Sequence, residues 1–230
     1  INNLNKVIVP IAGLGTRLLP ATKAIPKEML PVVNKPIIQY VVEEIIEAGF
    51  KEIIFITHSS KSSVENHFDQ SFELETILKK RVKRRLLKEV KSISNLKISI
   101  QTIRQGQALG LGHAILCAKP IVQKEPFAVV LPDMLIKKIN EKNDLFELKK
   151  EFEKSGKSQI LVGRIQKKDV SSYGIVKLQN QLIKSIVEKP SLKKAPSNLF
   201  VIGRYIFKND FFKYLKNNKP SNSGEFELTS

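Results

Sequence analysis

The stretch from Ile8 to Tyr40 reads IVPIAGLGTRLLPATKAIPKEMLPVVNKPIIQY, and the rest of the chain is interpreted from it. It begins with an apolar run short enough for a buried strand and then opens at Gly13 and Gly15. Because glycine has no Cβ, backbone N–H groups at these positions can approach an anion closely. A hydroxyl and a guanidinium, Thr16 and Arg17, follow at once and suit phosphate oxygens. The stretch therefore predicts a strand that ends in a phosphate-binding loop.

Two better-known glycine motifs are excluded in this loop. The dinucleotide fingerprint G-x-G-x-x-G needs a third glycine where Leu18 stands, and the Walker sequence G-x-x-x-x-G-K-[ST] is absent. A simple bend would explain the two glycines alone. However, Arg17, Lys23 and Lys27 are interspersed with prolines, whose fixed φ stiffens the loop. A rigid basic loop favours a binding function.

The segments after the loop predict an α/β fold. Residues 36–49 have proline at a helix start, glycine at its end and apolar residues at helical spacing. Residues 51–57 form a second buried strand, so the order strand, helix, strand predicts a right-handed βαβ unit and a largely parallel sheet. The phosphate loop then lies at the carboxyl end of the first strand, where open α/β sheets bind ligands. Residues 59–90 are predicted to be helical, and later strands are expected at 96–103, 127–131, 159–163, 174–178, 183–187 and 198–207.

Length and composition set further bounds. A chain of 230 residues with 42% hydrophobic content can bury one sizeable core, which predicts a single domain. It has no apolar run of about eighteen residues that could span a bilayer and no charged-then-apolar leader. Its only cysteine, Cys117, rules out an intramolecular disulfide and fits a reducing compartment. We therefore expect a cytoplasmic protein without a membrane partner.

The net charge of +17 leaves a distant alternative, a nucleic-acid-binding module. Seven cations crowd residues 79–88, beside an apolar stripe at helical spacing. No aromatic residues are interleaved with these charges for base stacking, so a solvated helix face is favoured and no nucleic-acid partner is predicted.

A family resemblance is carried by residues 13–32, which read GLGTRLLPATKAIPKEMLPV. This string resembles the signature loop of the sugar-phosphate nucleotidylyltransferases, and most closely that of the bacterial UTP–glucose-1-phosphate uridylyltransferases. The resemblance implies a Rossmann-like nucleotidyltransferase fold with a mixed, mostly parallel central sheet flanked by helices. It also implies that UTP and glucose 1-phosphate are converted to UDP-glucose and pyrophosphate. Thymidylyl and adenylyl transferases share the G-x-G-T-R part, so another nucleotide or sugar remains the close alternative.

The resemblance assigns the nucleotide to two loops. The first contributes Ala12, Gly13, Leu14, Gly15 and Thr16. The second spans residues 104–114, where Gln105 and the backbone at Gly110 are expected to hold uracil. A glycine-rich loop before a helix is often only a turn, but an amide that both donates and accepts suits a pyrimidine edge.

An acidic residue, Asp133, follows the predicted strand 127–131. Such an aspartate is often a turn former, yet Mg²⁺ is typically held by one or two carboxylates plus substrate phosphates. The resemblance makes Asp133 the ligand of a Mg²⁺ cofactor. Related enzymes have Leu-Thr-Asp where this chain has Leu228, Thr229 and Ser230, so the second metal ligand is left open.

The sugar phosphate is assigned to the second part of the chain. The resemblance implies that Glu188 binds sugar hydroxyls, that Lys189 meets the sugar phosphate, and that Gly174 and Gly203 line the pocket. A charged hairpin end would also explain the sequence of residues 187–190. The predicted catalytic residues are those expected to contact the phosphates or the metal: Arg17, Lys27, Asp133 and Lys189.

The expected organisation is one nucleotidyltransferase domain over residues 1–230. Residues 1–135 form its nucleotide-binding half and residues 136–230 its sugar-phosphate-binding half. We expect the chain to be incomplete at its C-terminus, and to form a homo-oligomer if C-terminal helices are present.

Overall fold

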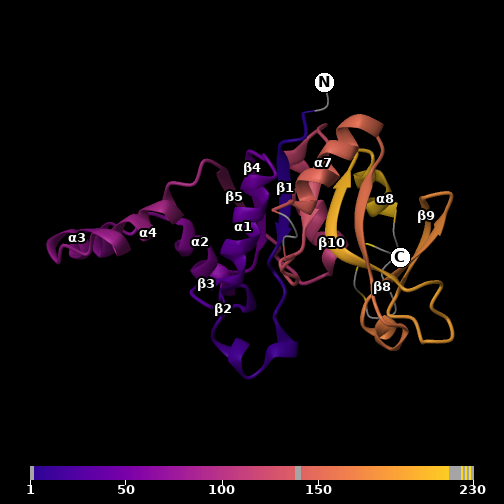
Figure 1. Cartoon of the computed structure of the whole chain (residues 1–230), viewed down its shortest axis with the longest axis horizontal. Coiled ribbons are helices and arrows are strands. Elements are labelled where there is room, and N and C mark those ends of the chain that lie inside the picture. Colours follow the sequence, from indigo (N-terminus) through magenta and orange to yellow (C-terminus); the bar gives the residue numbers. More distant parts are fainter. Residues whose placement is uncertain (1–2, 138–140, 218–223, 225, 227, 229–230) are drawn as a thin grey trace.

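The computed structural model describes residues 3–137, 141–217, 224, 226 and 228. Within these residues an eight-stranded sheet has the order β5-β4-β1-β6-β10-β8-β9, and β7 also pairs with β10 (Figure 1). Its strands are β1 (Lys6–Pro10), β4 (Glu52–Thr57), β5 (Ser99–Arg104), β6 (Phe127–Val130), β7 (Gln159–Arg164), β8 (Gly174–Gln179), β9 (Leu182–Glu188) and β10 (Leu199–Phe207). A short separate ladder joins β2 (Pro31–Val32) to β3 (Lys35–Pro36).

Strand direction confirms the predicted mixed sheet. β1 runs parallel to β4 and β6, and β4 runs parallel to β5. β10 is antiparallel to β6, β7 and β8, and β9 is antiparallel to β8. In this sheet, as described, β9 and β10 therefore oppose the other six strands, so most strands point the same way. The carboxyl ends of β1 and β6, which carry the phosphate loop and Asp133, meet at one edge.

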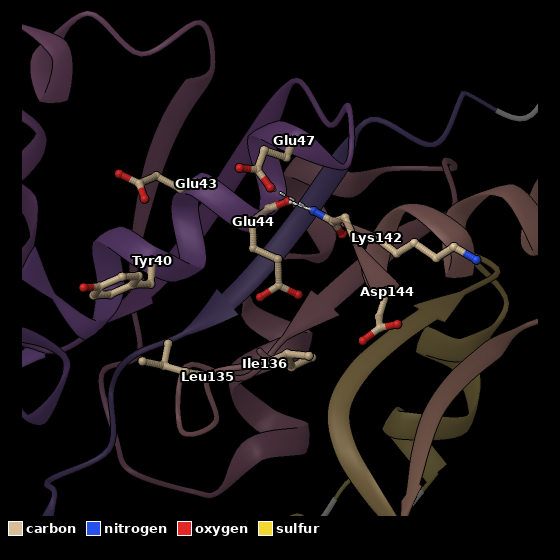
Figure 2. A pocket seen from close by; sticks show the side chains of 9 residues that line it. Tyr40, Glu43, Glu44, Glu47, Leu135, Ile136, Lys142 and Asp144 are labelled. Atoms are coloured by element: carbon tan, nitrogen blue, oxygen red, sulfur yellow. Dashed lines mark hydrogen bonds between the residues drawn. The ribbon is translucent and has the colours of Figure 1, made fainter. Parts of the chain in front are cut away.

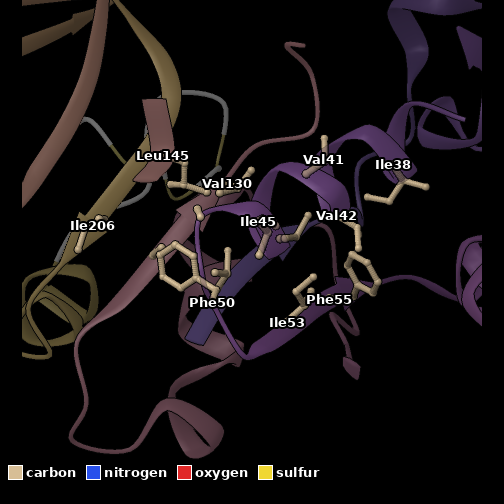
Figure 3. Close-up of a cluster of buried hydrophobic side chains, with 14 of the residues drawn as sticks. Ile38, Val41, Val42, Ile45, Phe50, Ile53, Phe55, Val130, Leu145 and Ile206 are labelled. Atoms are coloured by element: carbon tan, nitrogen blue, oxygen red, sulfur yellow. The ribbon is translucent and has the colours of Figure 1, made fainter. Parts of the chain in front are cut away.

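Helices cover both faces of the sheet, which explains why the inner parallel strands β1, β4 and β6 are mostly apolar runs, whereas the edge strand β5 mixes apolar and polar residues. On one face, α1 (Ile37–Glu47) and α7 (Asp144–Ser155) pack on side chains such as Val7, Val9 and Phe55. Figure 3 shows this cluster, with Ile45 of α1 above the strands. On the other face, α5 (Leu111–Cys117), α6 (Lys119–Val122) and α8 (Phe211–Asn217) pack on residues such as Ile8. Alternate residues of β1 thus bury into opposite layers.

The helical prediction for residues 59–90 is wrong in its continuity. The structure divides this region into a turn, η4 (Ser59–Lys61), and three helices, α2 (Ser62–Phe68), α3 (Phe72–Lys80) and α4 (Arg84–Ser94). Val82 adopts a positive φ of 52°, which ends the helical path between α3 and α4. In Figure 1, α3 and α4 extend away from the sheet, and the basic run 79–88 lies on this extension.

None of the helices in the described part of the chain is both long enough and apolar enough to cross a bilayer.

Candidate active site

The phosphate loop folds back on itself through three short turns. These are η1 (Thr16–Leu18), η2 (Ala21–Lys23) and η3 (Lys27–Met29). Gly15 has a φ of +71°, a left-handed conformation that glycine adopts without strain. Its carbonyl oxygen accepts hydrogen bonds from Thr22 Oγ1 at 2.7 Å and from the Leu18 N–H at 3.0 Å. The glycine therefore fixes a compact loop that presents Thr16 and Arg17 at its start.

The two loops assigned to the nucleotide line one hollow of about 420 Å³. This volume lies within the usual range for small-ligand sites. The predicted residues along it are Ala12, Gly13, Leu14, Thr16, Lys27, Gln105, Gly110 and Asp133. A methyl group at Gly13 would meet nothing within 4 Å, so space at that position is open toward the hollow.

The amide of Gln105 is held in place from the side of α5. Gln105 is buried, and its Nε2 donates to the Gly110 carbonyl at 3.2 Å. The same nitrogen lies 2.9 Å from His113 Nδ1 on α5. No local pattern in the sequence indicates this contact between Gln105 and His113. The arrangement fixes the orientation of the one amide predicted to recognise the base.

A second hollow adjoins the first along the phosphate loop. Its lining includes Gly15, Thr16, Arg17, Lys27 and Asp133. Arg17 and Lys27 of the phosphate loop therefore line the same hollow as Asp133, which follows β6. Gly15, which does not line the first hollow, contributes here.

A third hollow, of about 440 Å³, gathers the residues assigned to the sugar phosphate. Gly174, Glu188, Lys189 and Gly203 all line it, together with Arg17 and Asp133 from the other half of the chain. The sugar and nucleotide assignments therefore fall in neighbouring spaces.

Glu188 and Lys189 are presented by the β8–β9 hairpin. Gly174 pairs with Glu188 across the hairpin, and a Cβ at Gly174 would lie 3.1 Å from Glu188 Oε2. Glycine thus leaves room for that carboxylate. The backbone N–H of Lys189 donates to the Tyr173 carbonyl at 3.0 Å, and Lys189 Nζ lies 3.6 Å from Glu188 Oε1. A hydrogen-bond acceptor and a cation consequently lie side by side in the lining of the hollow.

Tyr205 is a lining residue that sequence reasoning missed. Burial raises the pKa of the Tyr205 phenol, and the negative charge of Glu188 raises it further. The group is therefore an O–H donor throughout the neutral range, next to the sugar hollow. The apolar run of β10 (Leu199–Phe207) gives no sign that its single tyrosine lines a hollow.

Asp133 lies at the junction of the three hollows, since it lines each of them. Its carboxylate forms an ion pair with Lys27 Nζ, and its side chain is 56% exposed. In the described part of the chain, no group of three or more His, Cys, Asp or Glu side chains could hold a metal. One exposed carboxylate that lines all three hollows nevertheless fits a Mg²⁺ that takes its other ligands from substrate phosphates and water. The position of Ser230 lies outside the described residues.

A fourth hollow lies on the α1 side of the sheet (Figure 2). Glu43, Glu44 and Glu47 of α1 border it, opposite Leu135 and Ile136. It contains none of the residues predicted for the site. Figure 2 shows the Glu44 carboxylate pointing away from α1 toward the segment with Leu135 and Ile136.

Known proteins resemble this chain over nearly all of its length. The family model described as nucleotidyl transferase matches residues 6–230. A UTP–glucose-1-phosphate uridylyltransferase from Haemophilus ducreyi is 52% identical, over 97% of this chain and 80% of the relative. The UTP-bound UGPase from Acinetobacter baumannii is 44% identical with a TM-score of 0.90, over 97% of this chain and 81% of the other. A UDP-glucose pyrophosphorylase complexed with UDP-glucose is 39% identical with a TM-score of 0.87, over 98% of this chain and 84% of the other.

The fold, the residues that line the hollows and the similarity to known uridylyltransferases all point to the same family. The mixed sheet places the two glycine-rich loops and the acidic strand end at one edge, as the signature loop implied. The chain therefore belongs to the nucleotidyl transferase family, and within it to the UTP–glucose-1-phosphate uridylyltransferases.

Proposed function

We propose that this protein transfers a uridylyl group from UTP to glucose 1-phosphate, giving UDP-glucose and pyrophosphate. The observation that supports this most is the position of the Lys27–Asp133 pair where three hollows meet. A triphosphate in one hollow and a sugar phosphate in the next would both reach this pair. The relatives named for the same reaction, with UTP or UDP-glucose bound in two solved structures, support the choice of substrates.

The reaction is an in-line attack of a sugar-phosphate oxygen on the α-phosphorus of UTP, with pyrophosphate as the leaving group. Such chemistry depends on positioning and charge neutralisation. Arg17 and Lys27 would neutralise the departing pyrophosphate, and Lys189 would hold the incoming phosphate. One ammonium about 4 Å from a phosphate charge contributes roughly 4 kcal/mol at an effective dielectric of about 20, before desolvation is subtracted.

The proposed cofactor is Mg²⁺, held by Asp133 and by phosphate oxygens. When bound, it would add positive charge beside the α-phosphate. Lys27 and Asp133 neutralise each other in the free protein, and both side chains retain solvent exposure. Separating an exposed ion pair costs about 0–1 kcal/mol. The substrates can therefore redirect Lys27 to phosphate and Asp133 to the metal at little cost.

The close alternative is transfer of a different nucleotide. A panel of UTP, dTTP, ATP, CTP and GTP against several sugar 1-phosphates, with pyrophosphate release as the readout, decides between them. We expect UTP with glucose 1-phosphate to give the highest kcat/KM. Higher kcat/KM with dTTP would make the protein a thymidylyltransferase. No pyrophosphate release, together with salt-sensitive duplex DNA binding, would favour the nucleic-acid alternative.

A loop-matched pair of variants tests the catalytic assignment. Lys27→Ala should lower kcat by about 10²–10³, the usual effect of losing one charged stabiliser of a transition state. Lys23 lies in the same loop, is exposed and lines none of the three hollows. Lys23→Ala should keep kcat near that of the parent. Equal turnover in both variants would remove Lys27 from the mechanism.

The proposed setting is the cytoplasm, because a chain with a single cysteine needs no oxidising compartment for its fold.

A further inference from the structure

A buried arginine, Arg204 of β10, lies behind the site. Its side chain has no exposed surface. Its neighbours in sequence, Gly203 and Tyr205, line the sugar hollow, whereas Arg204 itself binds Glu44 of α1 on the other side of the sheet. Arg204 therefore does not touch the space for substrates. A charge in this position needs another explanation, because burying a guanidinium is costly unless it is paired and hydrogen-bonded.

The guanidinium is paired with one carboxylate. Arg204 Nε donates to Glu44 Oε1 at 3.0 Å, and Nη2 donates to Glu44 Oε2 at 2.6 Å. This bidentate contact neutralises the arginine and fixes the plane of its fork. Glu44 is itself mostly buried, with 14% of its side chain exposed.

The remaining donors of the fork reach the Asp133 turn. Arg204 Nη1 donates to the Leu131 carbonyl at 3.0 Å, and Nη2 donates to the Met134 carbonyl at 3.0 Å. These two carbonyls stand on either side of Pro132 and Asp133. The N–H of Leu131 also donates to the Gly203 carbonyl at 2.9 Å. Hydrogen bonds from Arg204 thus hold the backbone of the turn at both ends, while Asp133 lines the hollows of the site.

We propose that Arg204 is a positioning residue for Asp133. With Glu44 as its counter-ion, Arg204 holds the Leu131 and Met134 carbonyls and so sets where the Asp133 carboxylate stands relative to Lys27 and to a divalent ion. This inference rests on the proposed function in so far as the ion is bound together with UTP. Lysine could not replace the fork, because its point charge cannot make the bidentate contact and also reach two carbonyls.

The test removes both buried charges at once. Replacing a buried ion pair by apolar residues of similar volume is often neutral for stability, so Glu44→Met/Arg204→Met should remain folded. Mn²⁺, which is detected by electron paramagnetic resonance, serves as the probe in the presence of UTP. We expect its dissociation constant to rise about 10- to 100-fold, as for other residues that orient a metal ligand. We also expect faster exchange of the amide hydrogens of Leu131, Asp133 and Met134.

A matched control separates this effect from general loss of an ion pair. Lys6 and Glu125 form an ion pair of 2.7 Å that borders none of the three hollows. Lys6→Met/Glu125→Met should bind Mn²⁺ with UTP as the parent does. If Glu44→Met/Arg204→Met does not fold, Arg204→Lys tests the positioning role instead. This variant keeps a cation beside Glu44 and loses the guanidinium that reaches the Leu131 and Met134 carbonyls.

The outcomes distinguish the two proposals. Parent-like Mn²⁺ affinity and exchange rates in a folded Arg204 variant would overturn the positioning role. Failure of the parent protein itself to bind Mn²⁺ with UTP, or to release pyrophosphate, would instead count against the proposed function.

Discussion

Lys61 and Arg204 are both buried cations with a glutamate partner, yet they meet that partner in different ways. Lys61 Nζ donates to Glu28 Oε2 at 2.8 Å, and Glu28 Oε1 is buried without a hydrogen-bond partner among the residues that the structure describes. Arg204 makes two hydrogen bonds to Glu44 and two more to backbone carbonyls. One pair leaves a polar atom unsatisfied, and the other occupies all three nitrogens of its guanidinium.

Each pair stands behind one member of the exposed Lys27–Asp133 contact. Glu28 follows Lys27 in the turn η3, and Arg204 ties the turn that carries Asp133. One fully hydrogen-bonded guanidinium can fix a turn at both ends, whereas one ammonium anchors a turn at a single atom. We therefore expect the Lys27 turn to adjust more readily when phosphates arrive, and the Asp133 turn to stay fixed.

The largest expected effect comes from breaking the lysine pair. Lys61→Met leaves the Glu28 carboxylate buried without a counter-ion, because that side chain is only 1% exposed. The free energy of unfolding should fall by about 3–5 kcal/mol, measured by urea denaturation at pH 7. Lys61→Met/Glu28→Met should recover most of this loss.

The control for Lys61 is a lysine whose pair is partly exposed. Lys35 contacts Glu43, and about a third of each side chain is exposed. Lys35→Met should cost about 0–1 kcal/mol. A similar loss in Lys35→Met and Lys61→Met would show that burial is not what makes the Glu28 pair important.

A smaller effect is expected at Gly203, the other support of the Asp133 turn. Gly203 has a φ of +79°, and a Cβ there would lie 3.0 Å from the Leu131 Cβ. Gly203→Ala should lower the free energy of unfolding by about 1–3 kcal/mol through backbone strain and this contact. Thermal unfolding provides the measurement.

A control at Gly156 separates backbone strain from the close contact with Leu131, the two contributions expected at Gly203. Gly156 also has a positive φ, of +63°, but a Cβ there would meet nothing within 4 Å. Gly156→Ala should therefore show the strain cost alone, about 1 kcal/mol. If Gly156→Ala destabilises the protein as much as Gly203→Ala, the close approach of Leu131 contributes nothing.

Much of the fold could be predicted from local sequence. The apolar runs of β1, β4 and β6 and the proline-to-glycine span of α1 carry their own signals of type and direction. The break at Val82 carried no such signal, because neither glycine nor proline marks it and the helical spacing of apolar residues continues through it. The type of an element could therefore be predicted where apolar periodicity agreed with glycine or proline residues at its ends. Where no such residue marked a break, the prediction joined separate helices into one.

The candidate site was predictable in many of its lining residues, from the glycine-rich loops and from the family resemblance, but not in the residues that support it from behind. The composition of the glycine-rich segments predicted binding loops, and their residues line adjoining hollows. Arg204 could have been noticed as a charge within an apolar strand. Its partner Glu44 is 160 residues away in sequence, and the contact exists only because β10 enters the sheet antiparallel beside β6. Local patterns contain no information on such a long-range pairing.

The smallest expected effect concerns a hydrogen bond between α2 and α1, the helices next to the two supports, which are the buried ion pairs Lys61–Glu28 and Arg204–Glu44. His67 of α2, the helix that follows Lys61, lies with its Nε2 3.1 Å from Oε1 of Gln39 on α1, the helix that carries Glu44. Burial lowers the pKa of the His67 imidazole below 6.5, the value expected in the unfolded chain. As pH falls, the unfolded chain takes up this proton first. The contribution of His67 to stability is therefore present above about pH 6.5 and declines below it.

The free energy of unfolding should consequently fall as the pH drops below about 6.5, with a slope from His67 well under roughly 1.4 kcal/mol per pH unit, because the ring is only partly buried. Urea denaturation at successive pH values measures it. His67→Gln should remove this part of the slope, and His58→Gln, which leaves His67 in place, should retain it. If the parent and His67→Gln have the same slope, protonation of His67 is not coupled to folding. The hydrogen bond between α2 and α1 would then contribute nothing to the pH response of the two supports.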